Sequence, residues 1–214
     1  MFTKMQKIIL TLIVVLPVLI FSSFSIGCLS IPGCNQYEKN YQFLYAKAQK
    51  YYQQNESSIA NRRYITIIDY TLPSYCKRMT ITDVVNGSRE RFLVTHGHGG
   101  KKGNIYAPGF SNIPESFLTP LGFLKTGEEY EGIHGRSLKL HGLEKGLNDK
   151  SEERNIVIHK ASYASQDAII ENISTEARPR LGESKGCPAL DPAVIHSVIN
   201  RLKDGSLVYI YGKK

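Results

Sequence analysis

The sequence predicts a mostly β domain with minor helices, and three observations lead to this fold class. From residue 64 onward, short stretches rich in β-branched residues alternate with turn-forming glycine, proline and asparagine. Asn86-Gly87, placed between two such stretches, is a strong β-hairpin signal. Helical spacing of apolar residues is clearest near the two ends of the chain, at residues 35–54 and 194–202.

Length and composition agree with one globular domain. A chain of 214 residues is long enough to bury a sizeable core. Its 42% hydrophobic and 21% charged residues exclude a wholly disordered, collagen-like or repeat architecture.

Residues 1–27 have the pattern of an export signal. Lys4 and Lys7 precede an apolar run at residues 8–21, and small, mostly polar residues follow. We therefore expect residues 1–27 to be a signal peptide or, if uncleaved, an N-terminal membrane anchor. A lipoprotein-like box before Cys28 adds lipidation there as a further alternative. In each case the remaining chain is exported, to the periplasm or cell envelope.

The charge of the chain suits such a location. The net charge is +8, and removal of residues 1–27 takes only two lysines with it. A modestly basic exported protein suits an anionic cell envelope as its surroundings. Because the sequence has no block of Lys and Arg and no nucleic-acid motif, we expect no nucleic-acid partner.

Residues 28–59 are predicted to be a helical N-terminal extension of a domain at 60–214. A tyrosine-rich stripe at helical spacing indicates an amphipathic helix over residues 35–54 that packs on that domain. The stripe consists of Tyr37, Tyr41, Leu44, Tyr45, Ala48 and Tyr52.

Strands and one further helix pair account for the rest of the chain. A short helix is expected at residues 166–172, and Asp191-Pro192 is predicted to cap and begin a longer helix that ends at Asp204-Gly205. The C-terminus is therefore a helix followed by a strand. The predicted strands are residues 64–70, 79–85, 89–95, 121–126, 129–133, 137–140, 155–159 and 206–211.

The cysteines point to one free thiol. If Cys28 lies at the cleavage point, Cys34, Cys76 and Cys187 remain, which is an odd number in an oxidising compartment. Cys34 and Cys76 could pair with each other, which would leave Cys187 free.

Cys187 stands in a sequence that suits a nucleophile. In Ser184-Lys185-Gly186-Cys187-Pro188, Gly186 allows a tight turn in which a backbone N–H can face an oxyanion. A helix that begins soon afterwards would favour the thiolate. The alternative is a buried, inert thiol in a turn. A cysteine nucleophile needs a base, and His159 ends the apolar strand Ile156-Val157-Ile158, where it would emerge at the rim of the sheet.

These residues resemble the catalytic domain of the L,D-transpeptidases (YkuD type), in particular the murein L,D-transpeptidase catalytic domain-like branch. The resemblance covers roughly residues 60–212 and rests on Ile158-His159 and Ser184-x-Gly186-Cys187. Other similar segments occur in the expected order: Thr95-His96-Gly97, Leu121-Gly122-Phe123, Thr126-Gly127-Glu128, Tyr130-Glu131-Gly132, His134-Gly135-Arg136-Ser137-Leu138 and Gly142-Leu143-Glu144.

The resemblance implies a β-rich domain that needs no cofactor and no metal. Cys187 would attack the carbonyl between the third and fourth residues of a peptidoglycan stem tetrapeptide and form a thioester, with His159 as base. The backbone carbonyl of Lys160 would orient His159, and the Gly186–Cys187 backbone, supported by Ser184, would form the oxyanion hole. Candidates for substrate contacts are His134, Arg180 and His96.

The sequence also departs from the family pattern. Lys185 stands where the family has His, Pro188-Ala189-Leu190 replaces an Arg or Asn after the cysteine, and the interval from His159 to Cys187 is long. These departures concern substrate recognition more than the nucleophile. They leave open whether the chain cross-links stem peptides, trims them as an L,D-carboxypeptidase, or binds peptidoglycan without turnover.

A metal hydrolase is an alternative from another class of enzyme. His96-Gly97-His98, together with His134 or His141, could supply zinc ligands. However, the two neighbouring histidines lie in a Gly-rich loop, and no carboxylate stands at a recognisable ligand spacing. The sequence does not indicate the oligomeric state.

Overall fold

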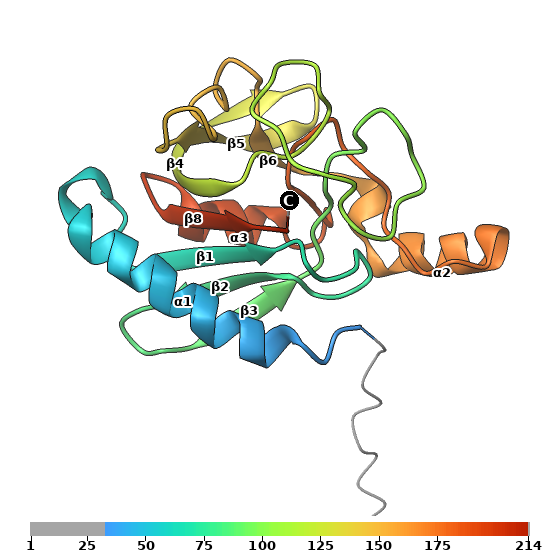
Figure 1. The fold of residues 1–214 in the computed structure, drawn as a ribbon, viewed down its shortest axis with the longest axis horizontal. Coiled ribbons are helices and arrows are strands. Elements are labelled where there is room, and N and C mark those ends of the chain that lie inside the picture. The colour runs from blue at the N-terminus through green and yellow to red at the C-terminus, as the bar shows by residue number, and fades with distance from the viewer. Residues whose placement is uncertain (1–32, 214) are drawn as a thin grey trace, which may run out of the picture.

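A computed structural model describes residues 33–213, which form an eight-stranded sheet with helices on both of its faces (Figure 1). The strand order is β3-β2-β1-β8-β4-β5-β6-β7, and the predicted mostly β fold class is confirmed. The strands are β1 (Tyr64–Asp69), β2 (Met79–Asp83), β3 (Arg89–Phe92), β4 (Gly122–Gly132), β5 (Gly135–Gly142), β6 (Val157–Lys160), β7 (Ala189–Leu190) and β8 (Leu207–Tyr211).

The predicted export signal and Cys28 lie outside the described residues. Within residues 33–213, no helix is both long enough and apolar enough to cross a bilayer.

Three α-helices are described besides the short 3₁₀ helices η1 (Glu56–Ser58) and η2 (Ser162–Ala164). The predicted N-terminal helix is confirmed as α1 (Tyr37–Gln54), which crosses the face of the sheet at β1 and β2 (Figure 1). Helix α3 (Ile195–Leu202) lies behind β8 on the opposite face, and α2 (Gln166–Glu176) projects from one end of the molecule.

Alternating side chains of the central strands supply both faces of the core, as the period of two in a strand requires. Towards α1, Ile65 and Ile67 of β1 belong to the cluster that contains Leu207 and Tyr209 of β8. Towards α3, Ile68 of β1 and Val208 and Ile210 of β8, which point to the other face, pack with Val198 and Ile199.

The tyrosine stripe faces the sheet, as predicted. Tyr37 and Tyr41 are buried, and their hydroxyls hydrogen-bond to Thr80 Oγ1 and Thr82 Oγ1 on β2, each at 2.7 Å. Because buried hydroxyls need partners, the threonines of β2 select where these tyrosines can lie.

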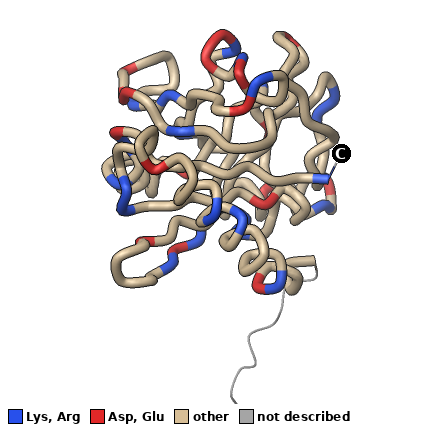
Figure 2. Tube along the Cα trace, turned by 60° about the vertical axis from the view of Figure 1, so that its left-hand side comes forward, with Lys and Arg blue, Asp and Glu red and all other residues tan. Residues whose placement is uncertain are grey.

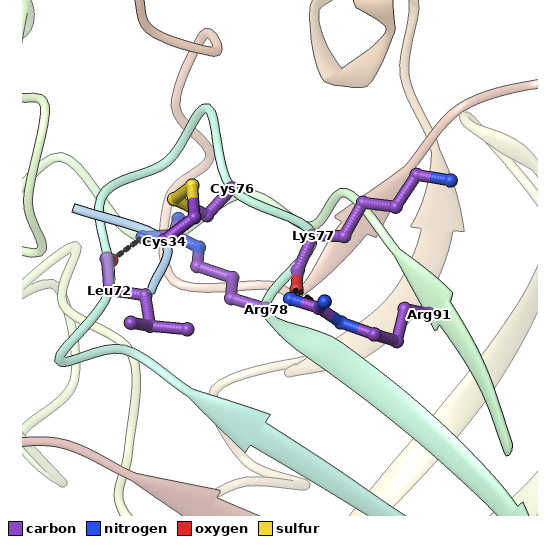
Figure 3. The surroundings of a disulfide bond; sticks show 6 residues. All are labelled: Cys34, Leu72, Cys76, Lys77, Arg78 and Arg91. Atoms are coloured by element: carbon purple, nitrogen blue, oxygen red, sulfur yellow. Dashed lines mark hydrogen bonds between the residues drawn. A yellow bond between two sulfur atoms is a disulfide. The ribbon is translucent and has the colours of Figure 1, made fainter. Parts of the chain in front are cut away.

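A disulfide joins the chain before α1 to the connection between β1 and β2. Cys34 and Cys76 are bonded, with their Cα atoms 5.6 Å apart, and Cys187 is free (Figure 3). The predicted pairing is therefore confirmed. Beyond Cys76, the buried Arg78 side chain donates to the Leu72 carbonyl.

Several elements differ from their predicted bounds. The strands expected at 121–126 and 129–133 are one strand, β4, with an irregularity between Thr126 and Glu129. The strand expected at 89–95 ends at Phe92, and the chain continues as a long connection to β4. Figure 1 shows this connection looping over the end of the sheet where β6 and β7 lie.

Acidic and basic residues are intermingled along the described chain (Figure 2). Many of them form ion pairs at the surface, such as Arg201 with Glu90 and Arg136 with Glu129.

Candidate active site

The candidate nucleophile lies directly before strand β7, beside β6. These strands are parallel, with His159 opposite Ala189 and Lys160 opposite Leu190. Continuing this register back by two residues brings Cys187 beside Val157, two residues before His159 on β6. A separation of two residues corresponds to about 6–7 Å along a strand.

The contacts of the thiol agree with this register. The half-buried Cys187 Sγ lies 3.4 Å from the Asn155 carbonyl oxygen, and the Val157 backbone N–H donates to the sulfur. Burial raises the pKa of the Cys187 thiol, while the Val157 N–H and the charge of Arg154 oppose that rise.

The helix expected to activate the thiol does not follow it directly. Cys187 is followed by β7 and then by a turn in which Asp191 Oδ1 accepts from the Ala193 N–H. Helix α3 starts only at Ile195, so its dipole is too distant to favour a thiolate at Cys187. Burial thus favours the thiol over the thiolate in the resting structure.

His159 is held as a neutral imidazole. Its Nδ1 lies 2.8 Å from the backbone carbonyl oxygen of Lys160, which can only accept, so the proton of the neutral ring is on Nδ1. Burial is the main reason that the pKa of His159 is lowered, and the neighbouring His134 lowers it further. The lone pair of Nε2 therefore remains for a proton, as a general base requires.

Within residues 33–213 the imidazole of His159 and the thiol of Cys187 are not hydrogen-bonded to each other. Catalytic hydrogen bonds are often long before substrate binds, so this spacing is compatible with a cysteine–histidine pair. The ring of the exposed His134 stacks on that of His159, with centroids 4.2 Å apart.

The turn that carries Cys187 is fixed by a neighbouring segment, residues 95–98. The Thr95 N–H donates to the Ala189 carbonyl, and the Ala189 N–H donates back to Thr95 Oγ1. The Ser184 N–H donates to the His96 carbonyl at 3.0 Å. A Cβ on Gly97 would lie 2.2 Å from the Phe117 carbonyl oxygen, so this close approach requires glycine.

Ser184 holds the turn internally, which changes the predicted oxyanion hole. The Gly186 N–H donates to Ser184 Oγ at 3.1 Å, and that hydroxyl donates to the Cys187 carbonyl at 2.6 Å. The Gly186 N–H is thus already engaged, and the prediction that it faces an oxyanion does not fit this conformation. The Cys187 N–H has no acceptor in the described part of the chain, so it is the available donor.

His96, a predicted substrate contact, is fully buried beneath the site. Its Nδ1 accepts from Arg78 Nη2 at 2.7 Å, and burial next to this cation drives the pKa of His96 far below its usual value. Its Nε2 has no hydrogen-bond partner among the described residues, and Glu183 Oε1 lies 3.8 Å away. A direct contact with substrate does not fit this position.

The other two predicted substrate contacts lie at the surface. His134 is exposed beside His159, as described above. Arg180 lines a cavity of about 590 Å³ together with Tyr163 and Asp191, but its guanidinium is paired with Glu176. A second cavity, of about 250 Å³, is lined by Asn155 and Val157, whose backbones contact the thiol.

The histidines of the alternative metal site do not converge. His96 is bound to Arg78, and His141 Nδ1 lies 3.0 Å from Glu152 Oε2. His98 Nδ1 accepts from the Gly100 N–H, while its ring stacks on Phe117. In the described part of the chain, no group of three or more His, Cys, Asp or Glu side chains is arranged to hold a metal ion.

Comparison with known families decides the relationship that these residues suggest. Residues 35–211 match the YkuD_2 family, whose description is L,D-transpeptidase catalytic domain. The chain belongs to this family. The match includes α1 as well as the whole sheet.

Solved structures with detectable similarity include two L,D-transpeptidases and the protein Bd1075. One from Mycobacterium smegmatis shares 12% identity at a TM-score of 0.41, covering 70% of this chain and 59% of that one. One from Stackebrandtia nassauensis shares 15% identity at a TM-score of 0.40, covering 73% and 58%. Bd1075 of Bdellovibrio bacteriovorus shares 14% identity at a TM-score of 0.42, covering 72% and 51%.

This chain thus spans less than two thirds of the length of each of these proteins. No curated protein matches its sequence.

Two residues of this L,D-transpeptidase domain escaped the sequence analysis as contributors to the site. Thr95 clamps Ala189 through both backbone and side chain. Arg154 lies close enough to influence the pKa of Cys187. Thr95 belongs to a segment that resembles the family, whereas no motif marks Arg154, which precedes β6 in an irregular stretch.

Proposed function

We propose that this chain is an exported, cysteine-dependent L,D-transpeptidase that acts on peptidoglycan stem tetrapeptides through a thioester on Cys187. The observation that carries the proposal is a half-buried free thiol that contacts the strand carrying the neutral His159, in a domain of the L,D-transpeptidase family. Lys160 fixes the tautomer of His159, which leaves Nε2 to act as the base.

Acylation begins from a neutral pair rather than from a preformed thiolate. The thiol proton moves to His159 Nε2 as Cys187 Sγ attacks the carbonyl carbon between the third and fourth stem residues. The Cys187 N–H stabilises the oxyanion. As the C–N bond breaks, the His159 imidazolium returns the proton to the nitrogen of the departing D-amino acid.

Deacylation completes the transfer. An acceptor amine attacks the thioester carbonyl and loses a proton to His159. As the C–S bond breaks, the His159 imidazolium returns this proton to the departing sulfur, which restores both the thiol and the neutral base. If water replaces the amine, the product is a shortened stem peptide, and the enzyme is an L,D-carboxypeptidase.

One experiment separates these functions. The protein is incubated with a disaccharide tetrapeptide, and both protein and products are analysed by mass spectrometry, with Cys187→Ala as the control. A covalent adduct on the wild type, release of the D-amino acid and formation of cross-linked dimers would support transpeptidation. Release without dimers indicates a carboxypeptidase, and binding without release indicates a silent peptidoglycan-binding module. Turnover by Cys187→Ala would overturn the thioester proposal.

The proposed organisation is an export signal or anchor at residues 1–27, a helical extension at 28–59 and the catalytic domain at 60–214. The support for export is the Lys4/Lys7 region with its apolar run, together with the cell-wall substrate on which the family acts. N-terminal sequencing of envelope protein should give a start between about Gly27 and Leu29, and intact Met1 in a soluble cytoplasmic fraction would contradict export.

A further inference from the structure

Arg154 is a cation without an anionic partner beside the candidate nucleophile. Its guanidinium donates to the carbonyl oxygens of Ser111 and Leu118 and to Ser116 Oγ, the last at 3.2 Å. All three acceptors are neutral. No carboxylate among residues 33–213 forms an ion pair with it, whereas several surface arginines, such as Arg201, have one.

The position of this guanidinium relative to the thiol is set by the turn at Gly186. A Cβ built on Gly186 would lie 3.5 Å from Arg154 Nη2, so the cation borders the turn that presents Cys187. The backbone of Gly186 has a φ of +122°, which favours glycine and allows this close approach.

The electrostatic coupling is mutual. The charge of Arg154 lowers the pKa of the Cys187 thiol, and a Cys187 thiolate in turn raises the pKa of Arg154, while burial acts in the opposite direction on each. A partly buried cation without a counter-ion is costly, and a nearby anion relieves that cost.

We propose that Arg154 is a positioning residue whose guanidinium acts as the counter-ion of the Cys187 thiolate. Its role rests on the proposed function, because it requires Cys187 to be the nucleophile. When the thiol proton moves to His159 Nε2, the new thiolate is stabilised by the imidazolium and by the guanidinium, which comes from a different segment. No other bond changes in this step.

A purely mechanical role is the competing explanation, since Arg154 also tethers residues 111–118 to the segment before β6. The two roles differ in one observable. A counter-ion changes the pH at which Cys187 ionises, whereas a tether changes only the stability of the loop and of the fold.

The test measures the rate of Cys187 alkylation by iodoacetamide as a function of pH. The Cys34–Cys76 disulfide leaves Cys187 as the free thiol of residues 33–213, and peptide mass spectrometry distinguishes its alkylation from that of Cys28. Arg154→Gln should move the midpoint of the pH profile upward by about one pH unit or more, which makes alkylation about tenfold slower at a pH below the midpoint. Arg154→Lys, which keeps a positive charge, should show a smaller change.

Arg91→Gln is the matched control. The Arg91 guanidinium also donates to a backbone carbonyl, that of Lys77 (Figure 3). It lies over the Tyr37 ring and is not among the charges that act on the pKa of Cys187. Its profile should equal that of the wild type. An unchanged midpoint in a folded Arg154→Gln protein would overturn the proposal and leave only the tether.

A second measurement needs no variant and tests the counter-ion role of Arg154 if Arg154→Gln fails to fold. In the wild type, the ratio of alkylation rates with anionic iodoacetate and neutral iodoacetamide should exceed the ratio for the same thiol in the urea-unfolded protein, because a guanidinium attracts the anion. Equal ratios would overturn the proposal. If the midpoint shift is found but the tetrapeptide releases no D-amino acid, the proposed function fails and the pairing of Arg154 with Cys187 stands.

Discussion

His96 and His159 are both buried, both lie beside the segment that carries Cys187, and both were candidates for functional roles. In both rings the protein engages Nδ1, but that nitrogen accepts a hydrogen bond in His96 and donates one in His159. In His96, Nδ1 accepts from the Arg78 guanidinium, so the proton of the neutral ring is on Nε2, which faces the buried Glu183. In His159, Nδ1 donates to the Lys160 carbonyl, so Nε2 keeps its lone pair.

This difference separates a structural histidine from a candidate base. A general base needs an unprotonated nitrogen that can reach the reacting proton. His159 meets that condition on β6, the strand whose Val157 N–H contacts the Cys187 sulfur, whereas the acceptor nitrogen of His96 is already used by Arg78. Two histidines in similar sequence contexts are thus distinguished by one hydrogen bond each.

The largest expected effect is the loss of acylation rate when His159 is replaced. His159→Ala should slow formation of the acyl-enzyme by about 10²–10⁴-fold, because it removes the proposed acceptor of the thiol proton. Rapid-quench mass spectrometry of the thioester measures this rate. If the His159→Ala protein formed the acyl-enzyme at the wild-type rate, another group would be the base.

The next effect concerns the disulfide near the His96 region. Cys76 lies two residues before Arg78, the residue that donates to His96. Replacing both Cys34 and Cys76 by serine should lower the free energy of unfolding by about 2–4 kcal/mol, because the unfolded chain loses a cross-link that closes 42 residues. Urea denaturation measures it. The pH profile of Cys187 alkylation should be unchanged, and a loss of reactivity in the folded variant would contradict a purely structural role.

A smaller effect on stability is expected at His96 itself. His96→Leu leaves the Arg78 guanidinium without one of its buried acceptors, which costs about 1–3 kcal/mol. His96→Gln, whose amide oxygen can accept, should recover part of this loss. Thermal unfolding measures the cost, and acylation per folded molecule should stay within a few-fold of wild type. A loss as large as that of His159→Ala would place His96 in the chemistry.

The smallest effect concerns the pH dependence of activity. Because burial holds the pKa of His159 below its usual value of 6.5, its neutral form persists below pH 6.5, and activity is lost only as the pH falls through the lowered value. His134→Ala removes a neighbour that disfavours the imidazolium, so this acidic limb should move slightly upward in pH. The pH profile of kcat/KM tests both statements. An acidic limb above pH 6.5 in the wild type would contradict them.

The sequence by itself determined most of the secondary structure, because those signals are local. The tyrosine stripe of α1, the Asn86-Gly87 hairpin and the alternation of β1 and β8 each depend on spacings within one segment. The odd number of cysteines left after residue 28, in a chain expected in an oxidising compartment, was enough to suggest the Cys34–Cys76 pair. The motifs around His159 and Cys187, together with similar segments between Thr95 and Glu144, were enough to suggest the family, which the match over residues 35–211 confirms.

Only the tertiary structure decided the surroundings of the thiol. Strand β7, which was not predicted, forms because residues 189–190 pair with β6, some thirty positions earlier in the chain, and the helix expected from Asp191-Pro192 begins only at Ile195. The engagement of the Gly186 N–H, the burial of His96 against Arg78 and the approach of Arg154 to Gly186 likewise depend on tertiary packing. The protonation of a side chain depends on the groups within a few ångströms of it. When these groups come from distant segments, they cannot be predicted from the spacing of residues within one segment.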